Sequence, residues 1–187
     1  MNEVRITGFG GSLRRGSYNR MLLNSAKSLM PEGSRLEIAE ISAIPLFNQD
    51  LEANPPEPVR VFKKSIKDAD GVLIVTPEYN YSIPGFLKNA IDWASRPYGD
   101  SAFEGKPVAM MSAGGRLGGA RAQYHLRQVF VFLNMKPVNL PEVFVMNPQT
   151  VFDGEGRLKD ERVRENISEL LSALVSKCRE NGAMRKD

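Results

Sequence analysis

The sequence predicts an α/β fold in which helices cover both faces of a parallel sheet. Short apolar runs rich in β-branched residues alternate with longer segments of helical period, a pattern typical of strands joined by crossover helices. The run between Gly71 and Thr76 is apolar without interruption, which indicates a central strand buried on both faces. Because no Gly/Ser-rich or Pro-rich spacer divides the 187 residues, we expect one domain that spans residues 1–187.

Five strands and five helices are expected in alternation along the chain. Pro84 suits the first turn of a helix that continues to Trp93, because that position needs no amide hydrogen. Between Asp160 and Arg179 the apolar residues recur with helical period on one side, so this helix should cover a face of the sheet. The expected strands are 4–9, 36–41, 71–76, 106–112 and 138–145, and the expected helices are 19–30, 58–67, 84–93, 119–133 and 160–179.

This order of elements suits a three-layer, doubly wound fold of flavodoxin type, with a five-stranded parallel sheet in the order 2-1-3-4-5. Ligands of such sheets bind beyond the carboxyl ends of the strands where the winding direction reverses, here between the first and third strands. Three unusual loops follow the first, third and fourth strands. We therefore expect all three at one edge of the sheet.

The first loop, residues 10–19, has the composition of an anion site. Its glycines let backbone N–H groups converge, the following helix N-terminus adds a favourable dipole, and Ser12, Ser17 and Asn19 supply neutral hydrogen-bond donors. Arg14 adds a charged contact that suits phosphate. The loop alone also fits an ordinary strand-to-helix connection, with Ser17 as a helix cap.

The second loop, residues 76–85, combines aromatic rings with amide and hydroxyl groups, a mixture that suits a flat heteroaromatic ligand. Tyr79 or Tyr81 can form an apolar wall, and Asn80 can meet polar atoms at a ring edge. A proline-stiffened turn with packed tyrosines is the alternative. The third loop, residues 112–119, has four glycines that permit close approach to a ligand, or else form a mobile surface loop.

Several other functions lack the residues that they require. A dinucleotide fingerprint beginning with Gly8 and Gly10 has Leu13 where glycine is needed, and no phosphate-binding loop of the nucleotide triphosphatases is present. One histidine and one cysteine cannot form a His/Cys zinc site, and scattered lysines and arginines argue against nucleic-acid binding despite a net charge of +3. Without a long apolar run or signal-peptide character, we expect no membrane contact and a cytoplasmic protein.

Taken together, the loops resemble those of the NADPH-dependent FMN reductase family, which includes quinone- and chromate-reducing members. The matching segments are 11–19 (GSLRRGSYN), 45–50 (PLFNQD), 76–85 continuing into 88–93 (KNAIDW), and the glycine-rich loop near Gly114. The resemblance extends over nearly the whole chain. Jointly these motifs are far more specific than any one of them.

The resemblance implies three groups of FMN-binding residues. The phosphate would be held from the first loop, the isoalloxazine ring would be bordered by the second, and the third would complete the pocket. In that order, the implied residues are Ser12, Arg14, Ser17, Tyr18 and Asn19; Pro77, Glu78, Tyr79, Asn80 and Tyr81; and Ser112, Gly115 and Arg116. Only one phosphate-type loop is evident, so FMN is preferred over FAD.

The same resemblance implies a reductase in which the flavin carries out the chemistry and no side chain acts as a nucleophile. NADPH or NADH would deliver hydride to flavin N5 and leave before a small acceptor enters, in a ping-pong cycle. Quinones, free flavin, azo compounds and chromate-like anions are the expected acceptors. Two alternatives remain: an FMN-binding electron carrier without a nicotinamide substrate, which the basic charge disfavours, and a module that keeps the fold without the cofactor.

A few residues outside the loops complete the expectations. Glu78 and Arg96 would frame the entrance for nicotinamide or an anionic acceptor, although a solvated arginine is equally consistent. His125 has no obvious serine or acid partner and is interpreted as structural, and Cys178 has no redox motif around it. Family members commonly form dimers or tetramers, and residues 81–93 are the expected contact, with Trp93 and Phe86 in a core or a subunit interface.

Overall fold

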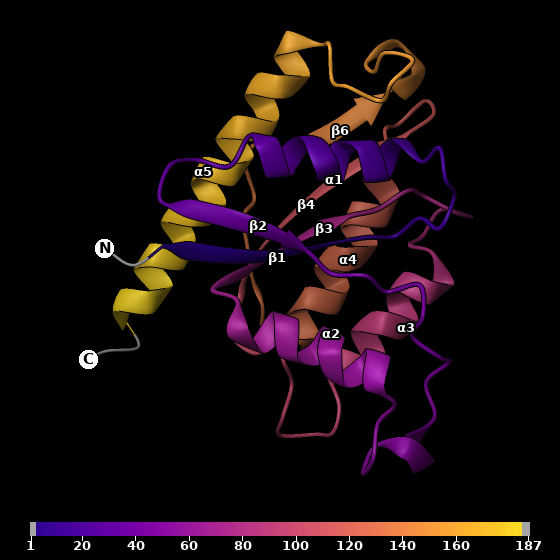
Figure 1. Ribbon diagram of the computed structural model, residues 1–187, viewed down its shortest axis with the longest axis vertical. Helices are drawn as coiled ribbons and strands as arrows, with labels where there is room; N and C mark the ends of the chain where they lie inside the picture. Colours follow the sequence, from indigo (N-terminus) through magenta and orange to yellow (C-terminus); the bar gives the residue numbers. More distant parts are fainter. Residues whose placement is uncertain (1–2, 185–187) are drawn as a thin grey trace.

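A computed structural model describes residues 3–184 of the chain (Figure 1). Its strands form one parallel sheet in the order β2-β1-β3-β4-β5, with β6 also paired to β4, which confirms the predicted order. The strands are β1 (Val4–Gly10), β2 (Ser34–Ile38), β3 (Gly71–Val75), β4 (Pro107–Gly114), β5 (Lys136–Pro137) and β6 (Val143–Met146). The helices are α1 (Tyr18–Ser28), α2 (Glu57–Asp68), α3 (Gly85–Ala94), α4 (Ala120–Phe132) and α5 (Glu161–Met184).

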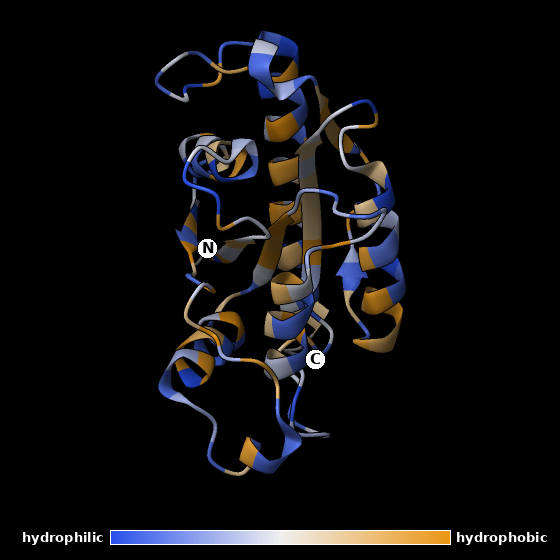
Figure 2. Cartoon of the chain, turned by 90° about the vertical axis from the view of Figure 1, so that its right-hand side faces the viewer, coloured by the Kyte–Doolittle hydropathy of each residue, from blue (hydrophilic) through white to orange (hydrophobic). Residues whose placement is uncertain are grey.

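Two apolar clusters, one on each face of the sheet, produce the three layers. On one face, α1 and α5 pack against the strands through residues such as Leu22 and Leu171. On the other face, α2, α3 and α4 bury residues such as Phe62 and Leu126. Figure 2 shows strongly hydrophobic central strands between helices that carry hydrophobic and hydrophilic residues on different sides. None of the helices within residues 3–184 has an apolar stretch long enough to cross a membrane.

Of the last predicted strand, residues 138–145, only the part from Val143 onward is a strand, and the short strand β5 lies just before the predicted start. β5 pairs with the beginning of β4, whereas β6 pairs with its end, from Met111 to Gly114. The intervening residues 139–142 leave the ladder, and Leu140 is exposed to solvent. Pro141 lacks the amide hydrogen that a sheet ladder needs, which explains the break.

The second strand is also displaced from its predicted position, residues 36–41. It begins at Ser34, opposite Val4, and ends at Ile38. Ile41 is buried after the strand has ended, in the cluster that contains α2 and α3. Its apolar character therefore reflects packing in a connecting segment and not membership of the strand.

The segment around residues 45–50 is fastened to α3. The Trp93 indole N–H donates a 2.8 Å hydrogen bond to the Pro45 carbonyl, and the Asn89 side chain bonds both Pro45 O and Phe47 N. Phe47 packs edge-on against Trp93, with ring centroids 4.9 Å apart. Trp93 is thus buried in the protein interior, one of the two places predicted for it, while Phe86 is half-buried against the apolar cluster beneath α2, α3 and α4.

Candidate functional site

The carboxyl ends of β1, β3 and β4 lie side by side and bring three loops to one rim of the sheet. Gly10 is in register with Val75, and Val75 with Met111. We call residues 10–19 loop 1, residues 76–85 loop 2 and residues 112–119 loop 3. A 2.8 Å hydrogen bond from Gly11 N–H to the carbonyl of Val75, the last residue of β3, ties loop 1 to the strand from which loop 2 begins.

Loop 1 leads into α1 in a way that suits a bound anion. Ser17 caps the helix, since its hydroxyl accepts a 3.4 Å hydrogen bond from Arg20 N–H. The first turn of α1 contains no acidic residue, so the positive end of the helix dipole is not neutralised locally. Ser12 is buried at the rim, and no residue among 3–184 forms a hydrogen bond with its hydroxyl. Both features favour phosphate binding.

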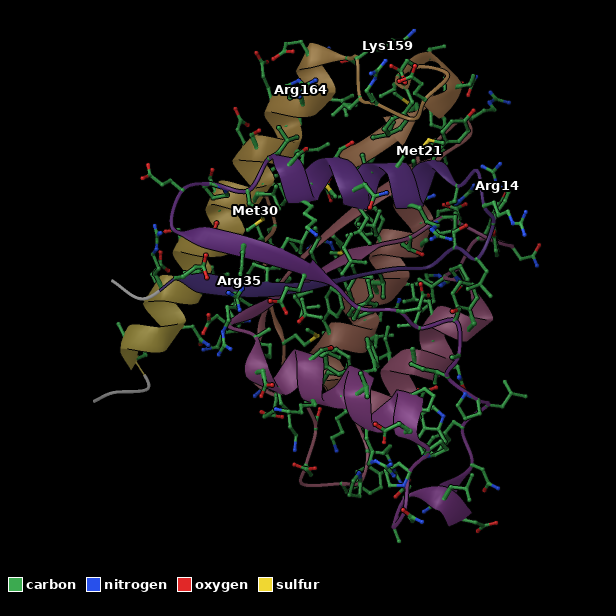
Figure 3. The ribbon with its side chains drawn as sticks, in the orientation of Figure 1. Arg14, Met21, Met30, Arg35, Lys159 and Arg164 are labelled. Atoms are coloured by element: carbon green, nitrogen blue, oxygen red, sulfur yellow. The ribbon has the colours of Figure 1, made fainter. Side chains whose placement is uncertain are left out.

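Arg14 and Tyr18 form the outer part of loop 1. Arg14 is exposed beyond the N-terminal end of α1 (Figure 3), and its guanidinium lies 5.6 Å from the centre of the Tyr18 ring. The other neighbour of Tyr18 is Phe152, stacked with an interplanar angle of 20°. A charged group is therefore held where it can reach a phosphate, while the Tyr18 ring is positioned by the C-terminal part of the chain.

Asn19 connects loop 1 to loop 3. Its side-chain N–H donates to the Ala113 carbonyl at 2.8 Å, and its side-chain oxygen accepts from Ala113 N–H at 2.9 Å. The amide is almost completely buried. The structure gives Asn19 a bracing role between two loops, and its predicted contact with the phosphate remains a prediction.

Loop 2 contains a two-residue turn that carries aromatic side chains into solvent. Tyr79 and Ser82 exchange two backbone hydrogen bonds of 2.9 Å and enclose Asn80 and Tyr81, whose φ angles are 49° and 67°. Both turn residues are thus left-handed, as in hairpin turns of type I′. Tyr79 is 50% exposed and Tyr81 66% exposed. The exposed parts of both rings can border a planar ligand, whereas Pro77, just before them in the chain, is buried.

Glu78 and Arg96, which were predicted to frame the entrance together, have different partners in the structure. Its carboxylate accepts a 3.1 Å hydrogen bond from Arg121 N–H and forms an ion pair with the Arg121 guanidinium. Arg96 follows the far end of α3, where its Nε lies 2.6 Å from Glu52 and its guanidinium stacks 3.7 Å from the Tyr98 ring centre. The two predicted entrance residues therefore belong to different clusters, and an entrance role for Arg96 remains a prediction.

Loop 3 uses its glycines for two purposes. Gly118 and Gly119 have φ angles of 58° and 86°. A Cβ on Gly118 would lie 2.8 Å from the carbonyl carbon of Phe144, and a Cβ on Gly119 would lie 2.7 Å from the Cβ of Ser112. Gly115, in contrast, has open space where a Cβ would be, next to the exposed Arg116. The first pair permits the loop to pack, and Gly115 leaves room for a ligand.

The arrangement of loops agrees with a comparison of the whole sequence. The sequence profile of the NADPH-dependent FMN reductases matches residues 4–149. The chain belongs to this family. Members bind FMN and use a reduced nicotinamide, so the chain is an NAD(P)H-dependent flavin oxidoreductase.

Relatives in bacteria and plants support the assignment to the FMN reductase family. An NAD(P)H-dependent FMN reductase of Pseudomonas aeruginosa is 51% identical over 175 residues, covering 92% of this chain and 94% of the relative. An NAD(P)H:quinone oxidoreductase of Solanum tuberosum is 47% identical, with 91% of each chain covered. The solved structure of FerB, a flavoenzyme NAD(P)H:(acceptor) oxidoreductase from Paracoccus denitrificans, has a TM-score of 0.88 and 32% identity, covering 95% of this chain and 98% of that one.

The residues at the rim fit FMN in this reductase. The N-terminal end of α1, the Ser12 hydroxyl and Arg14 supply donors and positive charge for one phosphate group. The exposed turn tyrosines supply an apolar border, and Gly115 leaves space on loop 3. Ser112 is fully buried, and its hydroxyl accepts a 2.8 Å hydrogen bond from Gln123. A direct contact of Ser112 with the flavin therefore remains a prediction.

Sequence reasoning missed several residues that shape the site. His125 is not without a serine partner, because its Nδ1 shares a 2.8 Å hydrogen bond with the Ser82 hydroxyl. Arg121 and Phe152 also contact predicted site residues from 43 and 134 positions away. Only the lack of an acidic residue in the first turn of α4 hinted that a carboxylate from elsewhere would bind there.

Cys178 takes no part in the site. It lies buried on α5, and its sulfur packs so closely against Gly71 that a Cβ at that position would be only 2.5 Å away. Burial raises the pKa of the Cys178 thiol to about 12, so the thiol stays protonated at neutral pH.

Proposed function

We propose that this enzyme passes electrons from NADPH or NADH to quinones at an open face of bound FMN. The observation that carries this proposal is the exposed aromatic turn of loop 2, which offers a planar acceptor two largely exposed tyrosine rings on the ligand-binding rim. Relatives named as quinone reductases support it, including a 2-hydroxy-1,4-benzoquinone reductase of a Burkholderia species that is 43% identical.

The proposed roles follow the division of the rim. Ser12, Arg14 and the N-terminus of α1 bind the phosphate, and Tyr79 and Tyr81 border the ring. Bound FMN supplies hydride acceptance at N5 and electron donation to the acceptor. The protein orients the two substrates in turn against one face, and no side chain forms a covalent bond with either.

Other acceptors are ranked below quinones by their shape. Free flavin and azo compounds are planar and can occupy the same face, whereas chromate is a tetrahedral anion that cannot stack against tyrosine rings. We propose that chromate reduction, where it occurs, depends on the permissive flavin and on nearby cations such as Arg116. A comparison of kcat/KM for a benzoquinone, FMN, an azo dye and chromate tests this order, which a preference for chromate would overturn.

Steady-state kinetics separate this enzyme from an electron carrier. With NADPH and a benzoquinone as the two substrates, a shared face predicts parallel double-reciprocal lines and turnover without any added reductase. Intersecting lines would indicate that both substrates bind at once, and would count against a single face that the two substrates occupy in turn. Failure to consume NADPH with any acceptor, despite bound FMN, would instead support the carrier.

We also propose that the enzyme works as a homodimer or homotetramer in the cytoplasm. Residues 81–93 remain the proposed contact, although buried Trp93 cannot contribute to it. The neighbouring face of α4 supports self-association, because Val131 is 83% exposed and Phe132 76% exposed. Light scattering should give a mass above that of one chain, and Phe132→Glu should reduce it; a strictly monomeric wild type would contradict this proposal.

A further inference from the structure

The turn in loop 2 has a backbone conformation that its own residues do not favour. Asn80 tolerates a positive φ, but a bulky residue such as Tyr81 rarely adopts a φ of 67°. Two backbone hydrogen bonds between Tyr79 and Ser82 close the turn, yet the turn protrudes into solvent with both tyrosines exposed. An additional source of stabilisation is therefore expected where the turn contacts the rest of the protein.

Arg121 supplies one such contact in three ways. Its guanidinium lies 3.5 Å from the centre of the Tyr81 ring, close enough for stacking and for a cation–π interaction. The same guanidinium pairs with Glu78, and the Arg121 N–H bonds the other carboxylate oxygen at 3.1 Å. Arg121 thus contacts both Glu78, which comes just before the turn, and Tyr81, the left-handed residue at the tip of the turn.

His125 supplies a second contact one helical turn further along α4. Its Nδ1 lies 2.8 Å from the hydroxyl of Ser82, the residue that closes the turn. Residues four positions apart lie on the same side of a helix, so Arg121 and His125 face loop 2 together. They contact the turn from opposite ends, at Glu78 and at Ser82.

We infer that Arg121 and His125 are positioning residues that hold the Asn80–Tyr81 turn in its left-handed conformation and thereby set the aromatic border of the flavin ring. This inference rests on the proposed FMN site. Because α4 begins directly after Gly119, the two side chains also couple loop 2 to loop 3. Both loops then present one preformed surface to the flavin, which lowers the ordering cost of binding.

The test measures FMN affinity of the apoprotein by quenching of flavin fluorescence, together with the visible circular dichroism of the bound flavin. Arg121→Ala removes the ion pair and the stacking, and should weaken FMN binding about three- to tenfold, no more than loss of the Tyr81 ring itself. Arg121→Lys keeps the charge without the planar stack and should fall between Arg121→Ala and wild type. Both changes should alter the dichroism of bound flavin, because the ring border moves.

His125 is tested through its partner. His125→Ala and Ser82→Ala should each weaken FMN binding roughly three- to fivefold, and the double variant should be no worse than either single one, since all three lack the same hydrogen bond. His125→Gln retains a side-chain amide that can bond Ser82 and should restore most of the affinity. Arg35→Ala is the matched control, because Arg35 is an exposed, ion-paired arginine on β2, remote from Arg14 in Figure 3.

The outcomes distinguish this inference from the proposed function. Wild-type apoprotein that fails to bind FMN overturns both. Normal wild-type binding, with Arg121→Ala and His125→Ala unchanged in affinity and dichroism, overturns the positioning role alone. If the losses of FMN affinity in Ser82→Ala and His125→Ala add up in the double variant, the proposed hydrogen-bonded link is overturned. Losses that are graded from Arg121→Lys to Arg121→Ala, together with a double variant no worse than either single one, support the inference.

Discussion

The two ends of the proposed flavin site are built in different ways. At the phosphate end, Ser12, Arg14 and the capped start of α1 come from ten consecutive residues of loop 1. At the ring end, loop 2 relies on α4, whose contacting residues Arg121 and His125 lie 43 positions further along the chain. A local segment therefore forms the anion site, while the border of the ring depends on tertiary packing.

Because of this difference, we expect the two ends to contribute differently to the affinity for FMN and to the orientation of the flavin ring. The phosphate end should determine how tightly FMN binds, because charge-assisted hydrogen bonds to phosphate are the strongest interactions available at the rim. The ring end should determine how the flavin is oriented and which acceptors reach it. Variants at the two ends are thus expected to respond differently to ligands with and without a phosphate group.

The largest expected effect tests the packing that supports the ring end. Gly118→Ala adds a Cβ to a left-handed residue, 2.8 Å from Phe144 C, and should destabilise the protein by about 2–5 kcal/mol. Thermal denaturation measures the loss. Gly115→Ala is the matched control, since its Cβ would meet no atom within 4 Å and the melting temperature should change little. Equal melting temperatures for the two variants would contradict the close packing of loop 3.

The next effect isolates the phosphate end. Arg14→Ala should weaken FMN binding about 10- to 100-fold, the loss expected for a charged hydrogen bond to phosphate. Binding of riboflavin, which has no phosphate, should be unchanged in the same variant. Arg15→Ala, at the adjacent arginine, is the control. If Arg14→Ala impaired FMN and riboflavin equally, Arg14 would not be a phosphate ligand.

A smaller effect, with the opposite pattern, is expected at the ring end. Tyr81→Gly removes the aromatic ring while making the left-handed turn easier to adopt. It should weaken FMN and riboflavin binding by the same factor, roughly three- to tenfold, because only ring contacts are lost. Tyr81→Phe should bind both ligands normally. Loss of FMN binding alone would show that the two ends are not independent.

The smallest effect concerns the ion pairs of Asp100 with Lys63 and Lys67, which lie outside the site. It shows how much an exposed charge cluster contributes to stability, for comparison with the site variants. Lys63 and Lys67 donate hydrogen bonds to Asp100 and lower the pKa of its carboxyl to about 2. A lowered folded-state pKa stabilises the protein above the unfolded pKa of about 3.8, and the benefit is lost as the pH falls toward 2. Asp100→Asn should therefore lower the melting temperature slightly at pH 7, by at most about 3 °C, as expected for an exposed pair.

The pH dependence gives the check on Asp100. The difference in melting temperature between wild type and Asp100→Asn should shrink from pH 5 downward as the wild-type carboxyl becomes protonated. A difference that stays constant between pH 5 and pH 2.5 would mean that the ion pairs with Lys63 and Lys67 do not contribute.

The parts of the structure that sequence could predict are those encoded locally. The strand order, the three loops at one rim and the helix cap at Ser17 all follow from periodicity and from the spacing of glycine and serine. The break before β6 was missed because an apolar, β-branched run conceals the missing amide hydrogen of Pro141. The start of β2 at Ser34 was missed because strand length depends on the neighbouring strand, and not on hydrophobicity alone.

Ionic partners were beyond prediction for a related physical reason. Glu78 pairs with Arg121 and Arg96 with Glu52, and in each case the partner lies more than 40 positions away. Any of the many charged residues was an equally suitable partner from sequence, since pairing depends on where helices α3 and α4 place their termini. The bracing role of Asn19 was hidden similarly, because its partner is the backbone of Ala113.

The most direct test of the central claim is the visible spectrum of the purified protein, before and after addition of FMN and then of NADPH without oxygen. If the three loops bind a phosphorylated flavin, one FMN should bind per chain, riboflavin should bind more weakly, and NADPH should bleach the bound flavin rapidly. A protein that remains colourless, takes up no added FMN and leaves its fluorescence unquenched would contradict the site described above.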